Sequence, residues 1–433
     1  MSTKLALLGG RAVRTEPYPI HSTMIDEKEE HEVLEVLRGG HLSGFSARTG
    51  QRFLGGPKVQ QLEKDFAEHF GVEYAVSFNS ATSALHGIVA AAKVGPGDEV
   101  IVPPTTMSAT ASSILMQNAV PVFADIDDAT YCLDPDAVAD AISPRTKAVL
   151  TVNLFGHPSR LDELEALARK NDLVLLEDNA QAPGAAQNGR RTGTVGLMGV
   201  QSLNYHKGIQ TGEGGMVLTN DVRCAEHLRL IRNHAEVVID HMPNRDELGY
   251  ENMLGWNYRL TELQAAIGIA QLKKLDGLNA VRVKLAEMLT WQLQGYDFLT
   301  PPQVRDGCTH SYYLYPLRFH RDRIGISRET FCKAMQAEGI SIGQGYVRPI
   351  YLEPMYQRRI AYGSRGCPFK CPWFDGKVSY EPGRCPVAER LHFDEILTTD
   401  VCKHPNTERE IHEFVDSVDK ISTAVEELRA LEQ

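Results

Sequence analysis

A single lysine stands at the start of a glycine-rich turn between two apolar runs of the 433-residue chain. Lys207 follows a run at residues 197–203 and precedes one at residues 215–220, and both have the composition of short, largely buried strands. Catalytic side chains are common in connections of this kind. Lys207 could therefore serve as a nucleophilic amine. A lone loop lysine is more often a solvated surface residue, so the choice depends on its partners elsewhere in the chain.

An acid follows another strand-like run, at residues 173–176, where the carboxyl edge of a sheet is expected. The carboxylate of Asp178 would be desolvated there, which costs free energy unless it faces a cation. The protonated ring nitrogen of pyridoxal phosphate is such a cation, and a carboxylate that holds this proton makes the ring an electron sink. A helix cap or an ion pair with arginine is the alternative role for Asp178.

A phosphate site is expected where residues 79–85 leave the first strand and open a helix. The backbone N–H groups of Ala81 and Thr82 would point forward with the positive end of the helix dipole, which favours anions. Ser80 could instead be a plain helix cap. The hydroxyl of Ser202, at the end of the strand before the lysine, could add a donor to the same phosphate.

Met107 follows a further strand-like run and could lie against the face of a bound ring, with core packing as the alternative. None of these signals is specific by itself. Together, however, separate strand ends offer a nucleophilic amine at Lys207, an acid at Asp178, a phosphate cradle and a ring face. This combination predicts a pyridoxal phosphate site in which Lys207 forms a Schiff base with the cofactor.

The elements that must position these residues alternate along the chain. Strand-like runs occur at residues 73–78, 99–102, 120–125, 148–154, 173–177, 200–203 and 216–218. Helical patterns between several of them predict an α/β fold with a mostly parallel, seven-stranded sheet covered on both faces, and ligands then bind at the carboxyl ends of the strands. Capping-box patterns predict helix starts at Ser159, with Asp162, and at Thr261, with Gln264.

The alternation stops after residue 220, which predicts two domains. Residues 1–280 would form a large cofactor-binding domain with an N-terminal arm, and residues 281–433 a smaller α+β domain. The expected elements of the second half are helices at 261–275, 279–293 and 327–338, a strand at 312–319, an irregular cysteine- and proline-rich stretch at 348–384, and a last helix after Thr407.

Composition narrows the range of partners. The net charge of -11 and the absence of clustered Lys and Arg argue against nucleic acid, and 42% hydrophobic with 23% charged residues is typical of a soluble globular protein. The N-terminal apolar patch is too short for a signal peptide. No stretch approaches the roughly 18 apolar residues that span a bilayer. We therefore expect a cytoplasmic protein that acts on small molecules, without membrane contact.

The eight cysteines are scattered, and most have no partner at metal-ligand spacing. Cys367, Cys371 and Cys385 are closer together, but the spacing of the first two, the intervening prolines and the lack of a suitable fourth ligand disfavour zinc. Reduced, packed thiols and no metal site are the prediction.

Four motifs occur in an order and spacing that identify a family. Residues 79–85, residues 177–181, the stretch 202–215 with its lysine, and residues 255–264 together resemble the DegT/StrS family of sugar and cyclitol aminotransferases. The resemblance covers nearly the whole chain. It implies the type I pyridoxal-phosphate fold and a homodimer with each active site at the subunit interface.

The same resemblance implies a role for each site residue. Lys207 would carry the cofactor, Asp178 would pair with the ring nitrogen, Gln181 would reach the ring hydroxyl, Ala81, Thr82 and Ser202 would hold the phosphate, and Asn257 would reach it from the neighbouring subunit. Three departures from the family pattern stand out. Met107 replaces the usual aromatic residue, Ala81 replaces a glycine without losing the backbone donor, and the loop at residues 45–56 is longer than usual.

The implied reaction moves an amino group from L-glutamine or L-glutamate to a keto-sugar or keto-cyclitol. Residues 346–351, 371–374 and 385–389 are similar to the L-glutamine:scyllo-inosose aminotransferase branch, which serves aminoglycoside pathways. One alternative is a dehydratase of the same fold, which usually has histidine at the lysine position; His206 stands next to it. Another is a non-catalytic regulatory protein that binds the cofactor.

Overall fold

The computed structural model describes residues 4–19, 24–242 and 253–432, and seven strands of the described chain form one central sheet. Their order is β1-β9-β8-β5-β4-β2-β3. The strands are β1 (Tyr74–Phe78), β2 (Glu99–Val102), β3 (Val120–Phe123), β4 (Thr146–Val152), β5 (Val174–Asp178), β8 (Met198–Ser202) and β9 (Gly215–Thr219). Only β9 is antiparallel to its neighbours. The predicted α/β fold and its mostly parallel seven-stranded sheet are confirmed, with strand ends shifted by one or two residues.

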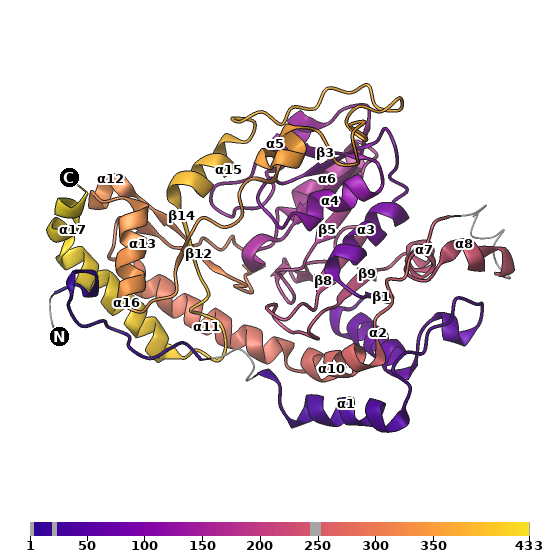
Figure 1. The fold of residues 1–433 in the computed structure, drawn as a ribbon, viewed down its shortest axis with the longest axis horizontal. Helices are drawn as coiled ribbons and strands as arrows, with labels where there is room; N and C mark the ends of the chain where they lie inside the picture. Colours follow the sequence, from indigo (N-terminus) through magenta and orange to yellow (C-terminus); the bar gives the residue numbers. More distant parts are fainter. Residues whose placement is uncertain (1–3, 20–23, 243–252, 433) are drawn as a thin grey trace.

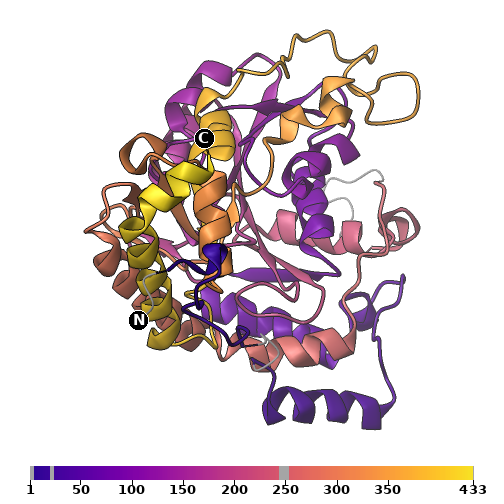
Figure 2. The ribbon, with the colours of Figure 1, turned by 60° about the vertical axis from the view of Figure 1, so that its left-hand side comes forward.

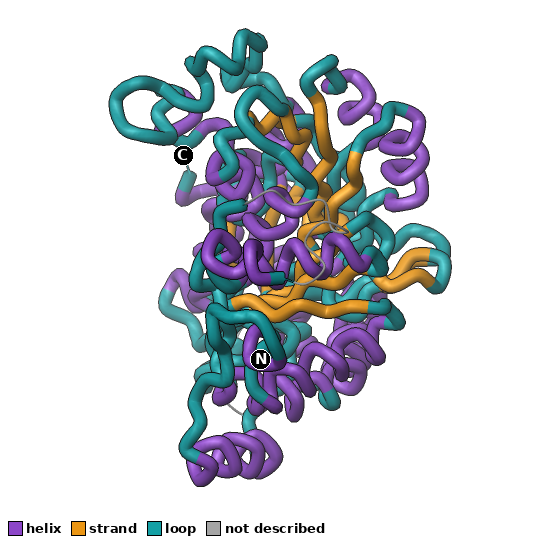
Figure 3. The backbone as a smooth tube through the Cα atoms, turned by 90° about the vertical axis from the view of Figure 1, so that its right-hand side faces the viewer, coloured by secondary structure: helices purple, strands orange, loops and turns teal. Residues whose placement is uncertain are grey.

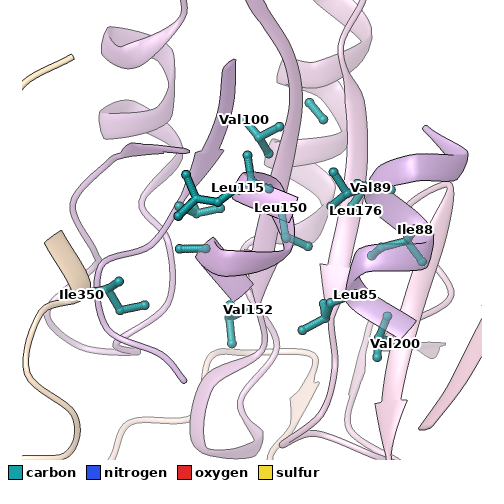
Figure 4. Packing of buried hydrophobic residues seen from close by; sticks show 14 of the residues in the cluster. Leu85, Ile88, Val89, Val100, Leu115, Leu150, Val152, Leu176, Val200 and Ile350 are labelled. Carbon is teal, nitrogen blue, oxygen red and sulfur yellow. The ribbon is translucent and has the colours of Figure 1, made fainter. Parts of the chain in front are cut away.

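Helices cover both faces of this sheet (Figure 3). One face packs against α3 (Ala81–Ala91), α4 (Ala109–Met116) and α7 (Val222–Arg232). The other face packs against α2 (Pro57–Phe70), α10 (Glu262–Leu272), α5 (Pro135–Ala141) and α6 (Leu161–Lys170). Strand β4 carries apolar residues on both sides, because both faces of the sheet are covered. Leu150 and Val152 pack on the first face (Figure 4), and Val149 packs on the second.

A second, four-stranded sheet in the order β10-β12-β14-β13 lies beyond the long helix α11 (Leu275–Leu293), on the left in Figure 1. Its elements are β10 (Leu299–Thr300), β12 (Tyr315–Phe319), β13 (Gly343–Gln344), β14 (Ile396–Thr399) and the helices α13 (Arg328–Ala337), α16 (Glu408–Thr423) and α17 (Val425–Leu431). They share a separate apolar core. The N-terminal segment joins this core through Leu5.

The irregular stretch after β13 folds back onto the large sheet. Ile350, Phe369 and Phe374 belong to the same apolar cluster as residues from all seven strands of the large sheet, and Figure 2 shows this orange segment extending along the large sheet. The short helices α14 (Pro354–Gln357) and α15 (Pro386–Arg390) lie within it. The predicted boundary between residues 280 and 281 falls inside α11 and stays a prediction.

The predicted cap at Ser159 is wrong. Helix α6 begins at Leu161, and the Ser159 hydroxyl is buried, where it accepts a hydrogen bond from Thr151 Oγ1 (2.8 Å) and donates to the Val152 carbonyl (3.0 Å). Asp162 instead accepts from Gln187 Nε2 (2.9 Å). A tertiary partner for the serine outweighs the local capping pattern.

The predicted capping box at Thr261 and Gln264 is confirmed, and it starts α10. The helix expected over residues 261–275 ends early, at Leu272, and the helix expected over residues 279–293 begins early, at Leu275.

The loop at residues 45–56 packs against the body of the protein rather than standing apart. Phe45 and Phe53 are buried, and Asn233 Nδ2 donates to the Ser46 carbonyl at 3.0 Å. Helix α1 (Glu27–Gly39), which precedes the loop, lies against α10 (Figure 1). None of the helices in the described ranges is long and apolar enough to cross a bilayer.

Candidate active site

Several of the predicted site residues lie at the carboxyl edge of the large sheet. Ser202 on β8 pairs with Gly215 on β9, and Gly215 pairs with Phe78 on β1. Asp178 on β5 pairs with Val200 on β8. Because β1, β5 and β8 are parallel, their carboxyl ends lie at one edge, and neighbouring strands are only about 4.8 Å apart. The phosphate turn, Ser202 and the acid are therefore neighbours in space.

Asp178 is buried, and its carboxylate is held from two sides. Oδ2 accepts a hydrogen bond from Thr110 Oγ1 at 2.7 Å, and Oδ1 accepts one from the backbone N–H of Ala180 at 3.1 Å. Burial raises the pKa of Asp178, while these hydrogen bonds and the charge of Lys207 oppose the rise. The electrostatic attraction between Asp178 and Lys207 indicates that both side chains face the same space.

Glu177, the neighbouring acid, has a different role. Its carboxylate points away from Asp178, as successive residues of a strand do. It accepts hydrogen bonds from the backbone N–H groups of Gly193 (2.7 Å), Val195 (2.8 Å) and Gly196 (2.8 Å). Glu177 therefore holds the chain that leads into β8 and has no free capacity for a ligand.

Lys207 lies in the turn of residues 203–214 between β8 and β9, which we call the lysine turn. Its Nζ atom is 4.4 Å from the centre of the Tyr313 ring. Burial lowers the pKa of Lys207 to about 8, with Asp178 acting in the opposite direction. A neutral amine, the form that attacks an aldehyde, is thus far more accessible at Lys207 than at an ordinary surface lysine.

Gln181 is oriented by two contacts. Its Oε1 accepts a hydrogen bond from the backbone N–H of Phe155 at 2.9 Å, and its Nε2 donates to the Tyr346 hydroxyl at 2.9 Å. The amide nitrogen still has one proton to donate toward the site. Burial raises the pKa of Tyr346 to about 12, so this phenol stays protonated at neutral pH.

The predicted phosphate cradle lies at the N-terminus of α3. The Ser80 side chain caps the helix by accepting from the backbone N–H of Ser83 (3.1 Å), which leaves the N–H groups of Ala81 and Thr82 without intrahelical partners. Gly215 lies directly against this turn, since a Cβ atom there would be 2.5 Å from the Ser80 carbonyl oxygen. Buried Ser202 lies beside Gly215 in the sheet.

Met107 and Asn257 lie at the margin of the described site. Met107 is 57% exposed, in the turn after β2, and does not pack in the core. Asn257 is exposed, and its segment lies beside the phosphate turn of its own chain, where Asn79 Nδ2 donates to the Asn257 carbonyl at 3.5 Å. The predicted reach of Asn257 into a neighbouring subunit, and the ring contact of Met107, stay predictions.

Three supporting residues were missed by sequence reasoning. Thr110 holds Asp178, Tyr346 holds Gln181, and Tyr313 lies under the Lys207 amine. The signal for Thr110 is the hydroxyl-rich run that follows β2. Tyr313 belongs to an aromatic run before β12, but the contact between β12 and the lysine turn is tertiary and leaves no trace in spacing.

The residues present fit pyridoxal phosphate. A buried carboxylate held by neutral donors can face a cationic ring nitrogen, a capped helix N-terminus offers free N–H groups to a phosphate, and a partly desolvated amine stands at the same edge. Within the described ranges, no three or more His, Cys, Asp or Glu side chains are grouped so that they could hold a metal ion.

Fold and site together define a pyridoxal-phosphate enzyme of fold type I. The chain belongs to the DegT/DnrJ/EryC1/StrS aminotransferase family, which matches residues 25–379. It is 34% identical over 443 aligned positions to the L-glutamine:2-deoxy-scyllo-inosose aminotransferase of Streptoalloteichus tenebrarius, covering 99% of this chain and all of the relative. The protein is thus a pyridoxal-phosphate-dependent aminotransferase of the group that acts on sugars and cyclitols.

Solved structures agree with this assignment. DesV of S. venezuelae, in complex with a ketimine intermediate, has a TM-score of 0.78 and 28% identity, covering 95% of this chain and 99% of DesV. A GDP-4-keto-6-deoxymannose-3-dehydratase with a trapped PLP-glutamate geminal diamine has a TM-score of 0.75 and 28% identity, with coverage of 92% and 99%. The same fold therefore serves both amino transfer and dehydration.

Proposed function

We propose that this enzyme moves an amino group from L-glutamine or L-glutamate to the ketone of a cyclitol related to scyllo-inosose, or of a keto-sugar, in aminoglycoside or amino-sugar biosynthesis. The observation that carries the proposal is the meeting of Lys207, Asp178 and the capped N-terminus of α3 at one sheet edge. Relatives that cover the full chain are named for transfer from L-glutamine to an inosose, and they favour the cyclitol acceptor.

Each residue has a defined task in this proposal. Bound pyridoxal phosphate supplies an electron sink for the carbon next to the transferred nitrogen. Asp178, oriented by Thr110, holds the proton of the ring nitrogen. Gln181 offers an amide proton to the ring hydroxyl, and Tyr346 fixes the direction of that amide.

Lys207 has two tasks, attachment and proton transfer. Its Nζ atom would hold the cofactor and, once displaced by the amino donor, would act as the base that moves the proton from the donor carbon. With a pKa of about 8, roughly one amine in ten is neutral at pH 7, compared with fewer than about one in a thousand for an unperturbed lysine.

The segment after β13 supports an acceptor site beside the cofactor. The backbone N–H of Ile350 donates to the Pro104 carbonyl (2.8 Å) just past the end of β2. Farther along, Val387 and Ala388 donate to the Asp125 carboxylate (2.8 and 3.0 Å) just past the end of β3. These contacts hold residues 346–391 next to the carboxyl edge, where ring hydroxyls of an acceptor could be recognised.

A homodimer with shared sites is part of the proposal. Its support is the exposure of Asn257 beside the phosphate turn and the exposed Met107, Tyr205 and Leu254, of which Tyr205 and Leu254 are 66% and 70% exposed. Exposed apolar side chains mark an interaction surface when they form a contiguous patch. The cytoplasmic location expected from the sequence stays a prediction.

A dehydratase on the same fold is the closest alternative. The residue that faces Asp178 electrostatically is Lys207, whereas the neighbouring His206 ring contacts Tyr205 and Tyr313. Burial lowers the pKa of His206 to about 4, which makes it a weak base. These observations favour amino transfer over dehydration. An intact set of amine, acid and phosphate cradle likewise has no use in a purely regulatory protein.

The two half-reactions test the proposal separately. Purified enzyme reconstituted with pyridoxal phosphate should lose its yellow colour with L-glutamine or L-glutamate as the cofactor takes up the amino group. Adding scyllo-inosose, 2-deoxy-scyllo-inosose or a nucleotide-linked keto-sugar should restore the colour for the true acceptor class, with the aminated product identified by mass spectrometry. Recovery only with the nucleotide-linked sugar would overturn the cyclitol assignment. Loss of a hydroxyl without amination would overturn amino transfer itself.

A further inference from the structure

Two buried cations lie behind the lysine turn, one on each side of Lys207. Lys403, which follows β14 in the C-terminal part of the chain, donates from Nζ to the carbonyl of His206 at 3.1 Å. Arg282, on α11, places Nη1 3.4 Å from the point where a Cβ atom on Gly208 would lie. The residues immediately before and after the reacting lysine are thus each in contact with a basic side chain from another element.

Neither cation is compensated in the usual way. Arg282 is 2% exposed and Lys403 is 6% exposed, and neither forms a direct ion pair with an acid in the part of the chain that the structure describes, although the charge of Asp400 attracts Lys403. Arg282 Nε also has no hydrogen-bond partner among the described residues. Burying an unpaired charge is costly, and apolar side chains would fill this space at lower cost. A role beyond stability is therefore indicated.

The surroundings of Lys207 show what such charges would affect. On one side the amine faces the attractive carboxylate of Asp178, and on another it lies over the Tyr313 ring. Lys207 and Lys403 repel each other, and this repulsion contributes to the lowered pKa of Lys403. The other charged or titratable side chains that act on these basic residues are His206 in the turn, Tyr313 before β12, and Asp400 and Cys402 after β14.

We propose that Lys403 and Arg282 are positioning residues for Lys207, which hold the backbone on either side of it and present positive charge behind its amine. This inference rests on the proposed role of Lys207 as the reacting amine. The charge disfavours protonation of the free amine after the donor displaces it, so that it stays a base. The hydrogen bond from Lys403 to the His206 carbonyl fixes the backbone next to Lys207. The Lys207 amine therefore keeps its position while it is not bonded to the cofactor.

The geometry also links two parts of the fold. Lys403 belongs to the segment after the smaller sheet, whereas His206 belongs to the large sheet's lysine turn. Lys403 itself still carries its charge in most molecules at pH 7, because burial and the charge of Arg282 lower its pKa only to about 8. Removing it should therefore raise the pKa of Lys207 by about one unit and leave about tenfold less neutral amine at pH 7.

The test measures the amine directly, without amino transfer. Full-length apoprotein is labelled with a trace of acetic anhydride from pH 6 to 10, and the acetylation of Lys207 is quantified by peptide mass spectrometry. The midpoint of the pH dependence of Lys207 acetylation is expected near 8 in the native protein. Lys403→Met should raise this midpoint by about one pH unit, and Lys403→Arg should restore the native midpoint. Arg282→Met should shift it in the same direction.

Lys420→Met is the matched control. Lys420 is a nearly buried lysine of the C-terminal part, paired with Glu338 Oε2 at 2.8 Å, and it does not contact the lysine turn. It should lower stability without moving the Lys207 midpoint. A native midpoint in folded Lys403→Met and Arg282→Met would overturn the inference. If Lys403→Met does not fold, the midpoints of Lys403→Gln and Arg282→Met test the inference instead.

These outcomes are separable from the proposed function. A shifted midpoint in an enzyme that aminates no cyclitol or sugar would leave the positioning role standing and remove the function. A native Lys207 midpoint in variants of an active aminotransferase would remove the positioning role and leave the function standing.

Discussion

Glu177 and Asp178 are adjacent acids, yet their environments assign them opposite roles. Glu177 is saturated by backbone N–H groups, whereas Asp178 has only Thr110 and Ala180 as donors and attracts the Lys207 amine. The position of Asp178 at a strand end could be predicted from sequence. The partners that make Glu177 structural could not, because they lie in the turn at residues 193–196.

Replacing each acid by its amide should separate the two roles. Asp178→Asn removes the charge that holds the ring proton, so kcat should fall about 10- to 100-fold, or about 2 kcal/mol, with little change in unfolding free energy. Glu177→Gln should lower the free energy of unfolding by about 1–3 kcal/mol and affect kcat much less. Steady-state kinetics at saturating cofactor and urea denaturation measure both. Equal effects of the two variants on kcat would contradict the assignment.

At the scale of elements, the site depends on close contact between β9 and the start of α3. Apolar runs predicted the strands, and the serine predicted the cap of α3, both correctly. The wrong prediction at Ser159 shows the limit of local patterns, because that serine found a buried partner in Thr151. Similarly, a glycine-rich sequence indicates a turn but does not reveal that Gly215 lies against Ser80.

Gly215→Ala should disturb the phosphate cradle. The new Cβ atom would meet the Ser80 carbonyl oxygen at 2.5 Å and the Ala81 nitrogen at 2.8 Å, so the backbone must move. At a typical overpacking cost of about 1–3 kcal/mol, affinity for pyridoxal phosphate should fall about fivefold or more. Fluorescence titration of the apoprotein measures it. Gly277→Ala in α11, where a Cβ meets nothing within 4 Å, is the control and should bind as the native protein does. Unchanged affinity in folded Gly215→Ala would refute this reading of the cradle.

At the scale of the whole molecule, the large sheet and its carboxyl-edge site followed from the alternation of apolar runs. The division into two parts is less regular than the sequence indicated. Residues after β13 return to the large sheet, and Ile350 packs in its core (Figure 4). A cysteine- and proline-rich stretch without periodicity gives no clue to where it packs. Its position beside the site became evident only from contacts such as that of Ile350 with Pro104.

The proposed homodimer can be tested by complementation. Lys207→Ala should be inactive. Asn257→Ala should have about tenfold lower activity if Asn257 donates a hydrogen bond to the phosphate. When the two variants are coexpressed, each mixed dimer would contain one site with both native residues. About a quarter of all sites would then be intact. Activity that rises above both parents to about this level supports shared sites. No gain on mixing would mean that Asn257 serves its own chain, or that the subunits do not share a site.

Attachment of the cofactor to Lys207 is the central claim, and borohydride reduction followed by peptide mapping tests it most directly. Reduction of the yellow holoprotein should fix one pyridoxyl phosphate per chain, on the peptide that contains Lys207, and the label should be absent from Lys207→Ala. The other buried lysine behind the turn, Lys403, should remain unmodified. A label on Lys403 or any other lysine, or none at all on a cofactor-saturated protein, would contradict the account.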